Sequence, residues 1–209
     1  MEKTVKQVDF KENQRPLDKA IIYEGYGAVA NTTKFVRESA SGKLTIVAIG
    51  DPSESLAAAI TLADDGAELI ELCGAISPVW RAKVSEAIGS RAKVSSVTFG
   101  FESLALAAAF SLSFHDGHPP REAFIILESG SDPIRDRFEQ AFHPQHTTFI
   151  PVPDEGMGAK IAAELVESGF GLIELYGGFT ASGAAKVIEA VNGRAPVGIG
   201  SFTLELTNQ

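Results

Sequence analysis

Cysteine and basic residues are both scarce in this chain of 209 residues. The only cysteine, Cys73, has no second thiol with which to form an intrachain disulfide or a cysteine-based metal cluster. Lysine and arginine together number 18 against 27 aspartates and glutamates, which gives a formal net charge of −9. A surface of that charge repels a phosphate backbone, so we expect no nucleic-acid partner.

Long apolar runs are also missing. The most apolar stretch, residues 104–114, is shorter than the roughly 20 residues that cross a bilayer. The first residues are charged where a signal peptide would be apolar. We therefore expect no membrane association and a cytoplasmic location. The 44% hydrophobic and 22% charged content is typical of a packed globular protein.

An internal repeat organises the sequence that is present. Residues 66–75 (GAELIELCGA) match residues 169–178 (GFGLIELYGG), at an offset of 103 (169 − 66). The same offset aligns the helical segment 82–87 with 185–190. A similarity that keeps its register through strand, loop and helix indicates a tandem duplication. The predicted parts are an N-terminal arm (1–18), a first α/β half (19–101), a connecting helix and loop (102–121) and a second α/β half (122–209).

Each half is predicted to run strand, helix, strand, helix, strand, helix, strand. The predicted strands, such as 45–49 and 69–73, are short continuous apolar runs, which are typical of parallel strands buried on both faces. With a crossover helix over 102–114, the count of eight strands and seven helices favours a compact (βα)8 TIM-like barrel built from two half-barrels. The alternative is two four-stranded parallel α/β sheets related by a pseudo-twofold axis.

Three segments resemble a family of uncharacterised microbial proteins. They are Leu-Ile-Glu-Leu-Cys-Gly at 69–74, Leu-Ile-Glu-Leu-Tyr-Gly-Gly-Phe at 172–179, and Arg-Ala-Pro-Val-Gly-Ile-Gly at 194–200. The resemblance is to domain of unknown function 6506, whose members are typically single units of about half this length. It implies that this chain is a fused version of a pair of such units, and it implies no activity.

Two glutamates stand out because a carboxylate inside a buried strand is costly unless it is paired or hydrogen-bonded. They are Glu71 and its repeat partner Glu174. Strand alternation places Cys73 on the face of Glu71 and Tyr176 on the face of Glu174. In a barrel that face brings both carboxylates to one cavity, where desolvation and repulsion raise a pKa as in general acids and bases. The alternative is that each glutamate holds the following loop through backbone N–H groups.

The remaining candidates lie where predicted strands end, since ligands gather at the carboxyl edge of parallel sheets. We predict Glu71, Glu174 and Tyr176 as catalytic residues. The turn at 177–183 enters a helix whose free N–H groups favour an anion, although it also fits a plain turn. The predicted substrate-binding residues are Glu24, Asp51, Cys73, Glu128, Asp154, Gly177, Gly178 and Ser201.

The four histidines form two His-x-x-His pairs, at 115–118 and 143–146. That spacing resembles a metal site, but both loops lead from a helix into a strand, opposite the expected site. We interpret them as solvent-exposed loops and predict no metal ligand. Cys73 has no histidine near it in sequence and is interpreted as a small buried apolar residue.

These features favour a metal-independent enzyme of isomerase or lyase type that acts on a small anionic metabolite by proton transfer, with no cofactor. The alternatives are a non-catalytic metabolite-binding or regulatory protein and, less favoured, an enzyme that uses the carboxylates to bind a divalent cation. The uncharged apolar segment 104–114 also favours a homo-oligomer, because exposed apolar surface usually finds a partner.

Overall fold

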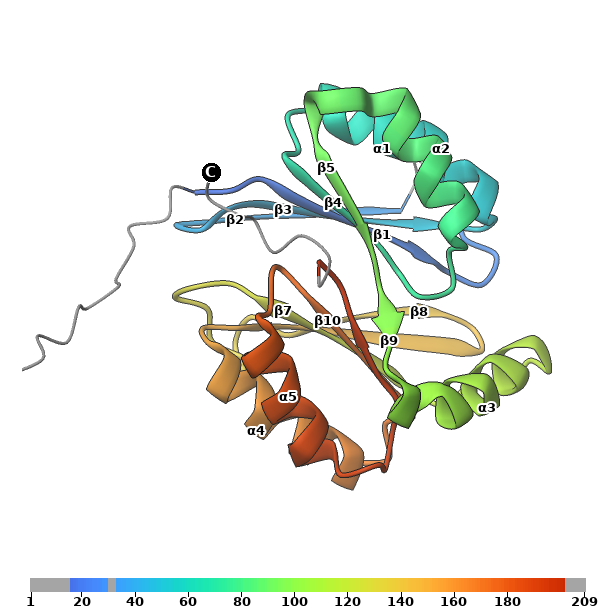
Figure 1. Ribbon diagram of the computed structural model, residues 1–209, viewed down its shortest axis with the longest axis vertical. Helices are drawn as coiled ribbons and strands as arrows, with labels where there is room; N and C mark the ends of the chain where they lie inside the picture. Colours follow the sequence, from blue (N-terminus) through green and yellow to red (C-terminus); the bar gives the residue numbers. More distant parts are fainter. Residues whose placement is uncertain (1–15, 30–32, 202–209) are drawn as a thin grey trace, which may run out of the picture.

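The computed structural model describes residues 16–29 and 33–201, which form two open β-sheets and five α-helices (Figure 1). Residues 1–15 of the expected N-terminal arm and residues 202–209 lie outside this part. The first half comprises β1 (Lys19–Glu24), β2 (Lys34–Ser39), β3 (Gly42–Ile49), α1 (Ser55–Asp64), β4 (Leu69–Leu72), α2 (Pro78–Ile88) and β5 (Lys93–Ser96). The second half comprises β7 (Glu122–Leu127), β8 (Phe138–Phe142), β9 (Gln145–Val152), α4 (Glu155–Glu167), β10 (Leu172–Tyr176), α5 (Ala181–Val191) and β11 (Val197–Ile199). Between the halves lie β6 (Thr98–Phe99) and α3 (Leu104–His115).

The strands do not close into a barrel. The first sheet has the order β2-β3-β1-β4-β5, and the second has the order β6-β11-β10-β7-β9-β8. All neighbours pair in parallel except β2 with β3, β6 with β11 and β8 with β9. The expected α/β class and the two repeated halves are present, whereas the TIM-like barrel is not formed. The arrangement is closer to the two-sheet alternative, with sheets larger than four strands.

The first connection in each half is a strand and not the helix expected from the alternating pattern. β2 and β8 both alternate between more and less exposed side chains, as a strand with one covered face does. Each forms an antiparallel hairpin with the next strand, β3 or β9. In each sheet this hairpin strand is an edge strand, and it takes the place of the expected crossover helix.

The two sheets pack face to face; α1 and α2 cover the outer face of the first sheet, and α4 and α5 cover that of the second (Figure 1). Strand alternation divides the side chains between these layers. In β7, Ala123 and Ile125 join the core beneath α4 and α5, whereas Phe124 and Ile126 join the core between the sheets. Tyr23 of β1 lies edge-on to Phe124, with ring centroids 5.6 Å apart.

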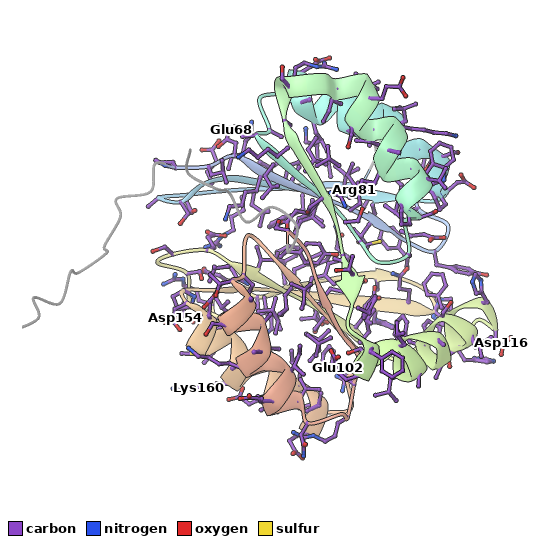
Figure 2. All side chains as sticks on the ribbon, viewed as in Figure 1. Glu68, Arg81, Glu102, Asp116, Asp154 and Lys160 are labelled. Atoms are coloured by element: carbon purple, nitrogen blue, oxygen red, sulfur yellow. The ribbon has the colours of Figure 1, made fainter. Side chains whose placement is uncertain are left out.

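The sheets run in opposite directions, so their carboxyl edges lie at opposite ends of the molecule. Asp116, which follows α3, and Asp154, which precedes α4, mark these ends in Figure 2. At the α3 end, the carboxyl ends of β1 and β4 meet the amino ends of β7 and β10. The eight strand tips that a barrel would gather at one mouth are therefore divided between two sites.

The duplication extends to surface contacts. Arg91 forms an ion pair with Asp64 in the first half, and Arg194 forms one with Glu167 at equivalent positions in the second. Each arginine also donates to a carbonyl of the preceding helix, that of Ala87 or Ala190. The two halves therefore repeat the same α/β unit down to its side-chain contacts.

The connection between the halves is part of both sheets. β5 ends the first sheet at Ser96, and β6 begins at Thr98 as the edge strand of the second sheet. α3 then lies beside the inter-sheet layer and has no fully buried residue (Figure 1). The apolar helix expected at 102–114 exists, but it does not cover a sheet face as a crossover helix does.

Candidate functional site

A cavity of about 330 Å³ lies between the two sheets at the α3 end; we call it the inter-sheet cavity. β1 and β4 bring Glu24 and Cys73 to its wall, and β7 and β10 bring Glu122 and Glu174. His115, the last residue of α3, lies on the same wall. Both halves and the connecting helix therefore build one site.

Aromatic rings form much of the remaining wall. They are contributed by β6, α3 and β7, and comprise Phe99, Phe110, Phe114 and Phe124. Such a lining, apolar with a few polar groups that converge, is usual for sites that bind small organic molecules. The volume lies within the range of these sites.

Glu174 is the most constrained carboxyl group of this cavity. It is 2% exposed; its Oε1 accepts the N–H of Gly74 at 3.0 Å, and its Oε2 accepts the hydroxyl of Tyr176. Burial and the negative charge of Glu122 raise the pKa of Glu174 to about 7, against the opposing effect of these hydrogen bonds. Both protonation states are therefore populated near neutral pH.

Glu122 is the second buried carboxyl group, and it begins β7. Its Oε1 accepts the side-chain amide of Gln145 at 2.7 Å and the hydroxyl of Thr147. Burial raises the pKa of Glu122, the two hydrogen bonds lower it, and the charge of Glu24 raises it further. The negative charge of Glu122 in turn raises the pKa of Glu174.

Glu24 and His115 occupy the more open part of the cavity. Glu24 is half-buried at the end of β1, and its burial raises its pKa, while nearby His115 lowers it and Asp51 raises it. His115 was expected in a solvated loop opposite the site. The structure places it on the cavity wall because α3 runs alongside the sheets and ends there.

Glu71 does not share this cavity with Glu174, contrary to the expectation from the sequence. It is fully buried between the sheets, where its Oε2 accepts the N–H of Gly177 at 2.8 Å and its Oε1 accepts the hydroxyl of Ser201. Opposed sheets carry the two equivalent glutamates toward opposite ends. Glu71 is therefore a contact between the halves and not the partner of Glu174.

The two glutamates make a reciprocal contact across the pseudo-twofold axis. Glu71 binds the backbone of Gly177, and Glu174 binds the backbone of Gly74, the equivalent residue in the other half. A Cβ atom at position 74 would lie 2.7 Å from Oε1 of Glu174, so the contact requires glycine. Each glutamate does hold a loop through a backbone N–H group, as the structural alternative expected. The loop, however, belongs to the other half and does not follow the same strand.

Tyr176 and Cys73 occupy equivalent positions and differ in their contacts. Tyr176 is fully buried, donates to Glu174, and packs against Phe124 with centroids 5.0 Å apart. Burial raises the pKa of Tyr176 well above its usual value, so the phenol stays protonated and positions Glu174. Burial likewise raises the pKa of the Cys73 thiol, which keeps it a neutral part of the wall.

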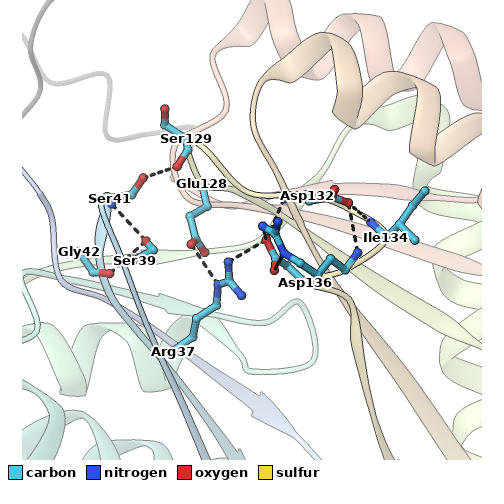
Figure 3. Close-up of polar contacts among 10 residues, drawn as sticks. Arg37, Ser39, Ser41, Gly42, Glu128, Ser129, Asp132, Ile134 and Asp136 are labelled. Carbon is cyan, nitrogen blue, oxygen red and sulfur yellow. Dashed lines mark hydrogen bonds and ion pairs between the residues drawn. The ribbon is translucent and has the colours of Figure 1, made fainter.

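The opposite edge carries Glu128, which lies one residue beyond the position equivalent to Glu24 (24 + 103 = 127). Its Oε1 pairs with Nε of Arg37 at 3.1 Å, and the same guanidinium pairs with Asp136 at 2.9 Å (Figure 3). Arg37 comes from β2 of the first half, so these ion pairs join the halves. Glu128 is held by a cation, whereas Glu24 faces a cavity.

Asp51 and Asp154 both act as helix caps. Asp51 accepts the N–H of Ser53 at 2.8 Å, and Asp154 accepts that of Met157 at 2.8 Å. Neither side chain lies on the inter-sheet cavity; Asp154 lies on a separate open depression at the opposite edge. The aspartate is present in both halves because it caps the start of the following helical segment.

Gly177, Gly178 and Ser201 also lie toward that opposite edge. Both glycines border the open depression and have positive φ, which favours glycine. Ser201 is buried and donates to Glu71. It lines neither the inter-sheet cavity nor the open depression. The anion expected at the start of α5 is supplied by the chain itself, because the carboxylate of Glu155 accepts the N–H of Thr180 at 2.6 Å.

Glu122, Gln145 and His115 are among the cavity residues that sequence reasoning missed. One signal was present: at the repeat offset of 103, Glu122 aligns with Lys19, so the duplication reverses a charge at the start of a buried strand. Lys19 donates to the carbonyls of Leu127 and Gly177, both at 3.2 Å, in the other half. At one edge the residue at this position, Lys19, joins the two halves; at the other edge its equivalent, Glu122, lines the inter-sheet cavity.

Within residues 16–29 and 33–201, no group of three or more histidine, cysteine, aspartate or glutamate side chains has the arrangement to hold a metal ion. The helices of the same part of the chain are too short or too polar to cross a membrane.

The family model described as a family of unknown function, DUF6506, matches residues 17–111 and again residues 120–208. The chain belongs to this family. It contains two tandem DUF6506 units, which agree with the duplication and with the two structural halves. Comparison with curated proteins and with solved structures gave no match.

Proposed function

We propose that this DUF6506 protein is an enzyme that transfers a proton within a small organic molecule bound in the inter-sheet cavity. The observation that carries this proposal is the pairing of two buried carboxyl groups, Glu122 and Glu174, on one cavity wall. One group removes a proton from the substrate while the other returns a proton to a different atom. Isomerisation and elimination both need this pair of steps.

The surroundings of the pair support acid–base chemistry. The pKa of Glu174 is about 7, and that of Glu122 is raised in the same direction. Repulsion between the two groups favours the state in which they hold one proton in total. That state contains a base and an acid together, as the proposed reaction requires.

Tyr176 and Gly74 keep Glu174 in place by occupying its two oxygens. Tyr176 is thus a positioning residue here, a different role from the catalytic one expected from the sequence. Glu122 replaces Glu71 as the partner of Glu174. Glu24 and Cys73 remain on the wall as binding residues.

The test is to incubate the purified protein with a small-molecule extract in D₂O and follow the mixture by mass spectrometry. A substrate that undergoes proton transfer loses abundance or gains deuterium, and Glu174→Gln and Glu122→Gln should each slow this by at least about 100-fold. Glu86→Gln, at an exposed position on α2, is the matched control. Identical changes with wild type and both cavity variants would contradict the proposal.

A further inference from the structure

The ionisable groups that line the inter-sheet cavity are mostly acidic. Among the residues that the structure describes, its ionisable wall residues include three carboxyl groups, Glu24, Glu122 and Glu174, and one basic side chain, His115. The sequence favoured an anionic substrate, but this wall offers an anion one basic partner and three groups that repel it. A ligand that carries positive charge would instead offset the cost of burying the carboxylates.

Glu122 uses one of its oxygens for donors from the protein itself. Both hydrogen bonds that it accepts from Gln145 and Thr147 go to Oε1. Glu122 is only 4% exposed and lies on the cavity wall. A donor from a ligand in the cavity would therefore stabilise a carboxyl group that bulk water solvates poorly.

The aromatic wall is compatible with the same charge. Phe99, Phe110, Phe114 and Phe124 offer ring faces and edges to whatever fills the cavity. A cation over a ring face is attracted by the ring quadrupole, and an apolar ligand body gains from the same rings. An ammonium has three donors and no acceptor, which matches carboxylates better than a hydroxyl does.

From these contacts we infer that the inter-sheet cavity takes a small organic amine, with its ammonium at Glu122 and Glu174 and its apolar body against the phenylalanines. This inference rests on the proposed function, because it names the substrate class of the same cavity. Glu24, nearer the opening, adds a further carboxyl group along the path of the cation.

The experiment compares ligands of one shape and different charge. Phenethylamine, 2-phenylethanol and phenylacetate form one set, and hexylamine, hexanol and hexanoate form another. We expect at least one amine at millimolar concentration to raise the Tm of the protein by about 2–4 °C while its alcohol and carboxylate do not. Calorimetry then gives the Kd of that amine.

The variants place the amine in the cavity. Glu122→Gln keeps an acceptor for Gln145 and Thr147, so we expect it to fold and to weaken amine binding by at least about tenfold. Glu24→Gln, at a less buried position, is the second variant and should weaken binding less. The control Glu86→Gln should bind as wild type does.

Three results would overturn the inference: equal or better stabilisation by the alcohols or carboxylates, no stabilisation by either amine, or unchanged amine binding in both cavity variants. Stabilisation by MgCl₂ that matches the amine would also overturn it in favour of an inorganic cation. Amine binding without any proton transfer to a substrate would reject the proposed function and leave the ligand class standing. Turnover of a neutral or anionic substrate would do the reverse.

Discussion

The two carboxyl edges of this molecule descend from one duplicated unit and differ in what holds their acidic groups. At the α3 edge, Glu24 borders a cavity whose other acidic wall residues are Glu122 and Glu174. At the opposite edge, Glu128 is paired with Arg37, and Lys19 stands where Glu122 stands in the other half. One edge uses its charges to join the halves, and the other keeps them facing a cavity.

The difference teaches how a fused pair can specialise. Two identical units related by a true twofold axis would have identical edges. After fusion, the positions of Lys19 and Glu122 vary independently, and α3 exists as a segment at one edge. One edge can therefore gain stability from ion pairs while the other keeps buried carboxyl groups that have hydrogen bonds but no cation, which is a common cost of function.

Removing the reciprocal glutamates should give the largest effect. Glu71→Ala removes a side chain that is 0% exposed and leaves the N–H of Gly177 and the hydroxyl of Ser201 without their acceptor. We expect the free energy of unfolding to fall by about 4 kcal/mol, and by about half as much for Glu174→Ala, where water can enter the cavity. Urea unfolding measures both; an equal or larger loss for Glu174→Ala would contradict the assignment of Glu71 to structure.

The cavity edge should also give a pH dependence of stability. The folded-state pKa of Glu174 is about 7, raised from an ordinary value of 4.5. The native state therefore binds more protons than the unfolded state between these pH values, and this contribution to stability is present at low pH and is lost as pH rises toward 7. We expect the difference in stability between wild type and Glu174→Gln to change by up to about 1.4 kcal/mol per pH unit over pH 5–7.

Urea unfolding at pH 5, 6, 7 and 8 for both proteins checks this slope. Acidic groups with a lowered pKa, such as Asp136, contribute in the opposite direction but cancel in the comparison. A difference that does not vary with pH would show that Glu174 is ionised throughout.

Replacing one charged residue at each edge should give the smallest changes in stability, with opposite signs at the two edges. Arg37→Met leaves Glu128 and Asp136, whose side chains are 6% and 7% exposed, without their shared cation. We expect a loss of about 2 kcal/mol, or a Tm lower by about 4–8 °C. Glu24→Gln removes a half-buried charge and should raise stability by up to about 1 kcal/mol. Comparable losses for both variants, measured by thermal unfolding, would mean that the edges do not differ in kind.

The sequence was sufficient to predict the duplication and the face on which Glu71 and Glu174 lie. The repeat keeps its register, and period-two alternation places both glutamates in the inter-sheet layer, where the structure has them. It was not sufficient to predict how the strands close. Alternating strands and helices fit both a barrel and open sheets, because the decision depends on which faces pack together and not on the local pattern.

The cavity could be predicted only in part for the same reason. Cys73 and Glu174 were visible as strand residues, but Glu122 begins its strand, where a charged residue is unremarkable. Its role depends on the opposed sheet, which brings the amino end of β7 against the carboxyl end of β1. His115 was misplaced because α3 was expected to cover a sheet face.

The passage of the chain from the first sheet to the second has a mechanical consequence. Only Val97 separates β5 from β6, and this valine is buried. This one-residue connection keeps the edge strands β5 and β6 next to each other, so the two sheets stay close together where the chain crosses between them. The cavity wall formed by α3, a helix with no buried residue, is in contrast the less enclosed part of the interior.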